Sequence, residues 1–244
     1  MRFTRLRIAM MALLSVGALG AACVFMVLHE PDFYRRAGMP PGPQRLEMSN
    51  EFFVRDFVQF IANFDNGRDP WNFSFTQDQL NSFFEEDFIR FGDADYFRKL
   101  GITNPRVEFA NDQIRIGFRY GTGRWSTVLS YDLKIWLAKS EMNVLAIEIQ
   151  RRRAGAMPIP TQQIFQELKD IGRRQNIDIE WYRHNGNPVA VVKFQCDRPR
   201  PTAQLQHIEI KNGTLRLQGQ SFDPVQNQFD DPTKKTTDSE QPPG

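Results

Sequence analysis

Cysteine and histidine are scarce in this sequence, and their scarcity excludes two common ways of stabilising or equipping a small protein. The chain of 244 residues has two cysteines, Cys23 in an apolar N-terminal run and Cys196 far from it. No disulfide framework is possible, so stability must come from burial. His184 and His207 have no Cys, Asp or Glu neighbour at metal-ligand spacing. We therefore expect no metal site and no cofactor.

The sequence also lacks a charge excess of one sign and the motifs of common enzymes. Its formal net charge is +2, which excludes a global basic field for nucleic acid. It contains no Gly-x-Ser-x-Gly elbow, phosphate loop or dinucleotide fingerprint. Acidic residues cluster at Glu85, Glu86, Asp87, Asp93 and Asp95. We interpret them as a solvated face, with a cation site or an acid/base pair as the alternative, and we predict that the protein is not an enzyme.

One long uncharged run is present near the N-terminus, from Ile8 to Leu28. A helix of about 21 residues, at ~1.5 Å per residue, spans the ~30 Å hydrocarbon layer. Arg2, Arg5 and Arg7 precede the run. The positive-inside rule therefore predicts a single-pass cell-membrane protein with a cytoplasmic N-terminus and an extracytoplasmic C-terminal domain.

Two alternatives to an uncleaved anchor remain open. A signal peptide could be cleaved at the stretch Ala18 to Ala22, which is rich in small residues, and Cys23 could carry a lipid. The apolar run nevertheless continues beyond both positions to Leu28. This continuation favours an anchor in residues 1–29.

Residues 30–46 are rich in proline and glycine, which predicts a stiff, unstructured spacer. A folded domain is expected over residues 47–222 and a polar, disordered tail over residues 223–244. The first helix of the domain should begin at Ser49 or Asn50 and run toward Asp65. Its apolar face is formed by Phe53, Phe57, Phe60, Ile61 and Phe64.

A strand leading directly into a helix is predicted at residues 71–88. Trp71 to Phe75 alternates in polarity. Thr76 and Gln79 have the spacing of a capping box, so a second helix should begin at Thr76. Its inward side chains would be Leu80, Phe83, Phe84 and Phe88.

The hydrophobic period then changes to two, which predicts an antiparallel meander. Its strands are expected at Arg106–Phe109, Gln113–Tyr120, Trp125–Ala138 and Asn143–Gln150. Strands of this length twist and curl, so the concave side of the sheet needs filling. We expect the helix from Thr161 to Arg174 to fill it.

Two hairpins should close the domain. Ile177 to Arg183 and Val189 to Gln195 form the first, and Leu205 to Lys211 and Thr214 to Gln218 form the second, around Asn212-Gly213. The predicted fold class is α+β, with a long curved antiparallel meander wrapped round a helix and preceded by a single N-terminal transmembrane helix.

The phenylalanine content points to a large apolar interior or an apolar cavity, because 21 Phe stand against 5 Tyr and 4 Trp. Arginines that could hold a phosphate head group lie near the proposed groove, at Arg151, Arg152, Arg153 and Arg173. The alternative explanation is structural: these arginines lie at the end of a strand and at the C-terminus of a helix, where the helix dipole favours positive charge. The expected groove lining is Phe118, Leu129, Leu133, Ile135, Ile147, Phe165 and Leu168.

Several features covering most of residues 71–220 fit one kind of known protein. They are the strand-to-helix entry from Phe73 to Asn81, the meander, the stretch from Arg153 to Pro160 before a helix, and the closing Asn212-Gly213 hairpin. With the anchor, they resemble anchored bacterial envelope proteins of the YpmS type and, more loosely, the tubular lipid-binding (TULIP) superfamily. The resemblance implies a curved sheet that encloses an apolar groove for a lipid tail.

We therefore predict a membrane-anchored, extracytoplasmic, non-enzymatic protein that binds a lipid or other amphiphile. The expected partners are the membrane, through Ile8 to Leu28, a lipid ligand and an envelope protein, but no nucleic acid. The alternative is an envelope scaffold or assembly protein whose groove is filled by its own helix and which acts through protein–protein contacts.

Overall fold

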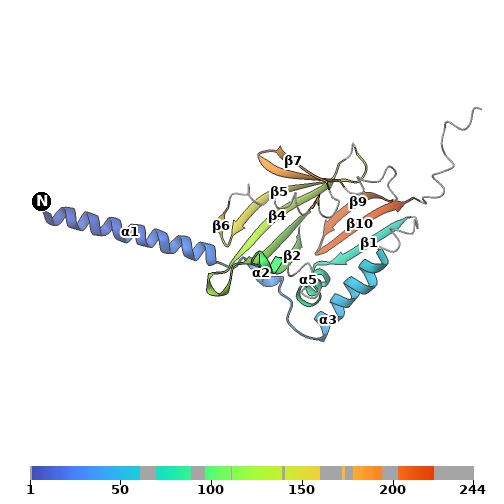
Figure 1. Ribbon diagram of the computed structural model, residues 1–244, viewed down its shortest axis with the longest axis horizontal. Helices are drawn as coiled ribbons and strands as arrows, with labels where there is room; N and C mark the ends of the chain where they lie inside the picture. Colours follow the sequence, from blue (N-terminus) through green and yellow to red (C-terminus); the bar gives the residue numbers. More distant parts are fainter. Residues whose placement is uncertain are drawn as a thin grey trace, which may run out of the picture.

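The computed structural model describes residues 2–60, 70–88, 97–110, 112–138, 141–159, 172–173, 178–193 and 203–222. These residues form an α+β fold with large antiparallel sheets, a few short helices and a long N-terminal helix that extends away from the sheets (Figure 1). The helix predicted at Thr161–Arg174 lies outside the described residues, apart from positions 172 and 173.

The N-terminal part of the chain is mainly helical. Its elements are α1 (Arg2–Leu28), α2 (Asp32–Arg36), α3 (Pro43–Asn50), a π-helix (Glu51–Phe57), β1 (Trp71–Thr76) and α5 (Gln77–Glu86). The remaining elements are β2 (Ile102–Ala110), β3 (Gln113–Tyr120), a 3-10 turn (Gly123–Trp125), β4 (Thr127–Leu137), β5 (Val144–Ala154), β6 (Met157–Pro158), β7 (Asp178–His184), β8 (Asn187–Lys193), β9 (Ala203–Lys211) and β10 (Thr214–Ser221).

The strands of the described residues form two sheets. The large sheet has the order β2-β3-β4-β5-β8-β7, with β6 paired to β5, and its first four strands follow the chain in antiparallel order. The small sheet has the order β1-β10-β9. The small sheet thus joins the strand that follows the first helices to the two closing strands of the chain.

Local turn and cap signals are confirmed. Thr76 caps α5 and exchanges hydrogen bonds with Gln79 as a capping box. Asn212 and Gly213 connect β9 to β10 with φ of 52° and 73°, both positive as a type I′ hairpin requires. These signals act over a few residues, which is why the sequence alone predicts them.

Several strand boundaries differ from the predicted ones. β2 begins at Ile102, since the strand continues through a register shift between Thr103 and Arg106 and so accommodates Pro105. β4 begins at Thr127, because the preceding residues form a 3-10 turn that includes Trp125. β5 continues to Ala154 and thereby includes the three consecutive arginines.

The first helix of the domain begins earlier than predicted. Pro43 occupies the first turn of α3, a position where its missing N–H costs nothing. The helix then widens into the π-helix, whose i→i+5 bonds shift the buried face. Phe52 is therefore buried, whereas Phe57 is exposed. The predicted positions 61–65 lie outside the described residues.

Residues 30–46 do not form the unstructured spacer that their composition predicts. α2 packs on the large sheet, where Phe33 and Tyr34 are buried with Val128. Gly117 makes this contact possible, because a Cβ there would lie 2.8 Å from the Tyr34 ring. The Tyr34 hydroxyl donates to the Asn104 carbonyl at 2.7 Å. The burial of two aromatic side chains thus folds this segment against the domain.

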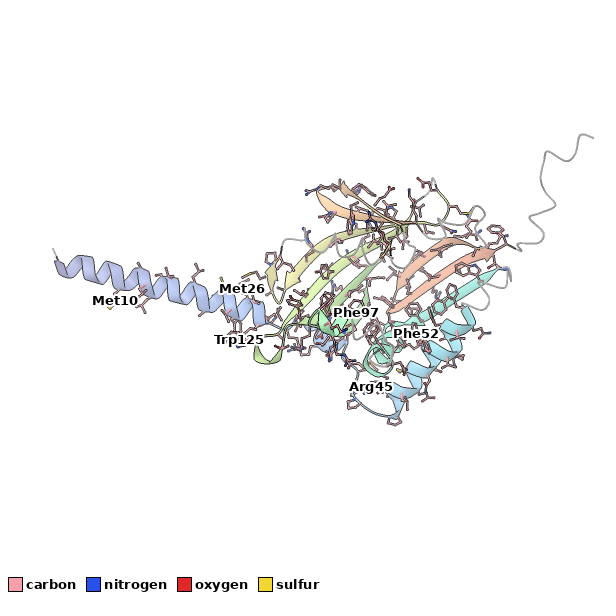
Figure 2. All side chains as sticks on the ribbon, in the orientation of Figure 1. Met10, Met26, Arg45, Phe52, Phe97 and Trp125 are labelled. Carbon is pink, nitrogen blue, oxygen red and sulfur yellow. The ribbon has the colours of Figure 1, made fainter. Side chains whose placement is uncertain are left out.

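The main core lies where the π-helix, α5 and the small sheet meet the large sheet (Figure 2). Its buried members are Phe52, Phe73, Phe75, Val107, Phe109, Ile114 and Ile210. Aromatic rings pack closely within it, with centroids 5.1 Å apart for Phe52 and Phe75 and 5.3 Å apart for Phe52 and Phe83. Much of the phenylalanine excess is therefore packed against itself.

Candidate functional site

The two faces of the large sheet have different surroundings. One face, here called the inner face, carries Ile114 and Leu133, which are cross-strand partners and pack in or against the main core. The opposite, outer face carries Gly117 and Val128, against which α2 packs. Because side chains alternate along a strand, these positions fix the side of every neighbouring residue.

The predicted groove residues of the meander share the inner face. Phe118 pairs with Leu129, and Ile135 pairs with Ile147. All are half-buried. The sequence prediction that they share a face is thus consistent with the strand register, while Phe165 and Leu168 lie outside the described residues.

The inner-face residues nevertheless divide into two groups. Leu133 and Ile135 pack against the main core, so the protein itself already covers part of their surface. Phe118 and Leu129 lie toward the opposite end of β4, where Phe118 stacks on Tyr131 with ring centroids 5.9 Å apart. The second group lies next to the start of β4, close to the end of α1.

The start of β4 is hydrogen-bonded to the last turn of α1. The Thr127 hydroxyl donates to the Val27 carbonyl, and the Ala156 amide donates to the Met26 carbonyl at 2.8 Å. Gly155 has φ of +59°, and a Cβ at this position would collide with the Met26 and Val27 carbonyl oxygens. The turn between β5 and β6 therefore packs directly against the end of α1.

An ion pair reinforces the same junction. Glu30, two residues after the end of α1, lies 3.2 Å from the guanidinium of Arg119 in β3. Sequence analysis singled out the stretch from Arg153 to Pro160 as the approach to a helix but missed its contact with the N-terminal helix. Its small residues, Gly155 and Ala156, were the available signal, because they allow another backbone to approach closely.

The three consecutive arginines do not share one face. A register shift between Asp132 and Leu133 places Arg151 opposite Asp132, on the outer face. Arg152 pairs with Tyr131 and belongs to the inner face. Arg153 pairs with Ser130, again on the outer face. Arg152 is thus the arginine of this run that accompanies Phe118 and Leu129.

Two of the other arginine candidates, Arg151 and Arg173, are exposed, whereas Arg153 is half-buried. The Arg151 guanidinium lies 3.9 Å from the Asp132 carboxylate and its side chain is largely exposed. Arg173 is also exposed. Arg151 is therefore not part of the inner-face group that contains Arg152.

The acidic cluster is not a solvated face over its described part. The Glu86 carboxylate lies 2.6 Å from Arg45, and Glu85 lies 3.2 Å from Arg106, with all four side chains mostly buried. Asp87 accepts a hydrogen bond from Ser49. These contacts tie α5 to α3 and β2. Asp93 and Asp95 lie outside the described residues.

No group of three or more His, Cys, Asp or Glu side chains that could hold a metal ion occurs in the described part of the chain. His184 lies at the end of β7, with its ring 6.2 Å from the Trp136 ring. His207 pairs with Gln218 in the small sheet. The two histidines therefore belong to different sheets.

Two surface depressions lie away from Phe118 and Leu129. The first is formed by α3 and the π-helix and is lined by Pro43, Leu46, Glu47, Asn50, Glu51, Val54 and Arg55. The second is formed by the β4–β5 turn and β9, around Met142, Asn143 and Leu205. Asn143 bridges the two sheets there, since its side chain bonds the Ala203 carbonyl and the Leu205 amide.

Fold and sites together define an α+β protein with an N-terminal helix that is long and apolar enough to cross a membrane. Comparison of the chain with protein-family models, curated proteins and solved structures gave no match. The resemblance to YpmS-type and tubular lipid-binding proteins therefore stays a prediction.

Proposed function

We propose that this is a membrane-anchored, extracytoplasmic, non-enzymatic protein that binds a lipid or similar amphiphile on the inner face of its large sheet. In this proposal α1 crosses the cell membrane with its N-terminus in the cytoplasm, following Arg2, Arg5 and Arg7. The meander β2–β5 curves round the helix predicted at Thr161–Arg174, and the acyl chain lies between them.

The observation that carries this proposal is the position of Phe118 and Leu129. These half-buried apolar side chains lie on the inner face, at the end of the sheet that holds the last turn of α1. An acyl chain leaving the bilayer beside α1 would meet them first. Each buried CH₂ contributes about 0.8 kcal/mol, so a short stretch of chain gives useful affinity.

Arg152 supplies a head-group contact in this arrangement. It lies opposite Tyr131 on the inner face, next to the apolar pair. A guanidinium donates two parallel hydrogen bonds to phosphate or carboxylate oxygens, and such charge-assisted bonds are stronger than neutral ones. Arg152 therefore favours an anionic amphiphile over a neutral one.

A single substitution tests the proposed lining. Leu129→Asp places a charge among the apolar side chains, and we expect at least a tenfold loss of affinity for a fluorescent fatty-acid analogue with the fold retained, measured by titration and circular dichroism. Lys134→Asp is the matched control, because Lys134 is an exposed residue of the same strand on the outer face. Equal affinity in the two folded variants would contradict the proposal.

Leu133→Asp separates the lining from the core. Leu133 packs against the main core, so this substitution should cost several kcal/mol and unfold the domain rather than weaken binding alone. A folded Leu133→Asp variant that loses only the fatty-acid analogue would place Leu133 in the ligand site instead.

A second function, an envelope scaffold, is favoured by the packing of the main core. Phe52, Phe73 and Phe75 fill the space between the π-helix and the sheets with the protein's own side chains. A scaffold protein needs no ligand in its interior. It would bind no fatty-acid analogue and would show the same titration curve before and after Leu129→Asp.

A further inference from the structure

Trp125 is exposed to an unusual degree for a tryptophan. Its side chain is 80% exposed in the 3-10 turn that connects β3 to β4. Large aromatic side chains usually contribute burial, so an exposed tryptophan suggests a surface that meets something apolar. Figure 2 shows Trp125 on the same side of the domain as the end of α1, near Met26.

The hydrogen bond between Thr127 and the Val27 carbonyl fixes the depth of this turn. Two residues of chain span at most about 7 Å, so the Cα atom of Trp125 lies within about 7 Å of the Cα atom of Thr127. Val27 is the penultimate residue of the uncharged run. If α1 crosses the membrane, Val27 lies at the edge of the hydrocarbon layer. Trp125 therefore lies close to that edge, beside a head-group layer that is roughly 5 to 8 Å thick.

Two further exposed apolar residues lie beside this turn. Tyr120 ends β3 and Leu100 precedes β2, and both are exposed. The Gly121 amide donates to the Gly101 carbonyl at 3.0 Å, which joins the two loops. We call Leu100, Tyr120 and Trp125 the interfacial patch. Tyrosine and tryptophan are the residues enriched at the membrane–water boundary.

We propose that the interfacial patch lies in the head-group layer of the membrane that α1 crosses, with Trp125 as its main contact. The domain is then attached to the bilayer at two points, through α1 and through the turn between β3 and β4. This inference rests on the membrane-spanning role of α1, but not on the proposed lipid site of the inner face.

The contacts between the domain and the end of α1 indicate that the interfacial patch meets the membrane surface. The hydrogen bonds to Met26 and Val27 and the ion pair between Glu30 and Arg119 hold the domain against the end of the helix. A domain held in this way brings its nearest loops to the bilayer surface. Lys99, exposed beside Leu100, adds a positive charge that suits anionic head groups.

Tryptophan fluorescence of the full chain in vesicles tests the inference. The vesicles contain phosphatidylcholine and phosphatidylglycerol, with or without bromine on the acyl chains, because bromine quenches nearby tryptophans. We expect brominated vesicles to quench the wild-type protein, and we expect Trp125→Phe to remove most of that quenching. The Trp125 side chain is exposed, so this variant should retain the fold, which circular dichroism checks.

A matched control moves the exposed tryptophan to the far end of the same strand. Met142 is 49% exposed in the turn after β4, and the 11 residues of β4 span about 33 Å. Figure 1 shows β4 running away from the end of α1. The double variant Trp125→Phe/Met142→Trp should therefore remain unquenched.

Three results would overturn the inference in distinguishable ways. Equal quenching of wild type and Trp125→Phe contradicts the position of the turn, as does quenching restored by Met142→Trp. Release of the protein from the vesicles by alkaline carbonate contradicts the membrane-spanning role of α1 itself. Protein that stays in the vesicles and shows Trp125-dependent quenching supports the inference.

Discussion

Gly155 is the residue on which the junction between α1 and the sheet depends. It combines a left-handed backbone with direct contact to the last carbonyls of α1. Gly186, in the turn between β7 and β8, shares the positive φ, at +82°, but a Cβ there would meet open space. A comparison of substitutions at Gly155 and Gly186 therefore separates the effect of backbone strain from the effect of steric collision.

We predict that Gly155→Ala detaches α1 from the sheet. The added methyl group cannot fit beside the Met26 and Val27 carbonyls. Limited proteolysis should then cut the chain between residues 28 and 32 much faster than in wild type. Gly186→Ala, the control, carries only the left-handed strain of about 1 to 2 kcal/mol and should leave the cleavage rate there unchanged.

An equal cleavage rate in Gly155→Ala and wild type would show that the contact between Gly155 and α1 does not hold the junction.

The three consecutive arginines of β5 show a limit of sequence analysis at the scale of single residues. The register shift in β5 places Arg151 and Arg153 on the outer face and Arg152 on the inner face, the reverse of simple alternation from Ile149. No local pattern in three identical residues signals such a shift.

Among the elements, α5 stabilises an edge of the large sheet. Within the described residues β2 lies at one edge of this sheet, and unpaired backbone groups at a sheet edge are open to pairing with another chain. Asn81 of α5 is fully buried and both donates to the Val107 carbonyl and accepts from the Val107 amide, at 2.8 Å each. Gln77 accepts from the Phe109 amide in the same way. α5 thus provides hydrogen-bond partners for backbone groups of β2 that a further strand would otherwise bind.

We expect Asn81→Ala to destabilise the domain by roughly 2 to 4 kcal/mol, because it leaves two buried backbone groups without partners. Urea unfolding measures the change, and light scattering should show association through the freed edge of β2. Asn72→Ala is the control, since Asn72 is an exposed residue of β1. A change below about 1 kcal/mol for Asn81→Ala would contradict the role assigned to α5.

The elements also show which parts of the fold a sequence can predict. The capping box at Thr76, the Asn212-Gly213 turn and the strand at Gln113–Tyr120 depend on neighbouring residues, and the structure confirms them. α2 and the π-helix were missed. Their placement depends on distant contacts, such as Tyr34 against Gly117, that no local pattern contains.

For the whole molecule, pairing between the beginning and the end of the domain determines the architecture. β1 pairs with β10, and the small sheet they form with β9 closes the main core. The sequence predicted each of these strands but not their separation into a second sheet. Strand pairing over such distances depends on the packing of all layers at once, which local signals do not specify.

In the candidate site, too, the sequence predicted the features that depend on local pattern and missed those that depend on distant packing. The shared face of Phe118, Leu129, Leu133, Ile135 and Ile147 follows from the period of two, so the sequence predicted it. The packing of Leu133 and Ile135 against the main core depends on the second sheet and was not predictable. The proposed ligand surface is accordingly smaller than expected and is centred on Phe118 and Leu129.

The central claim, that the domain holds an amphiphile, is tested most directly by native mass spectrometry of residues 30–222 purified without α1. This range keeps α2, whose buried Phe33 and Tyr34 belong to the fold. We predict a stoichiometric mass of a bound lipid or other amphiphile, identified by solvent extraction and lost in Leu129→Asp. A folded domain whose mass equals that of the bare chain would contradict the claim and favour the scaffold function.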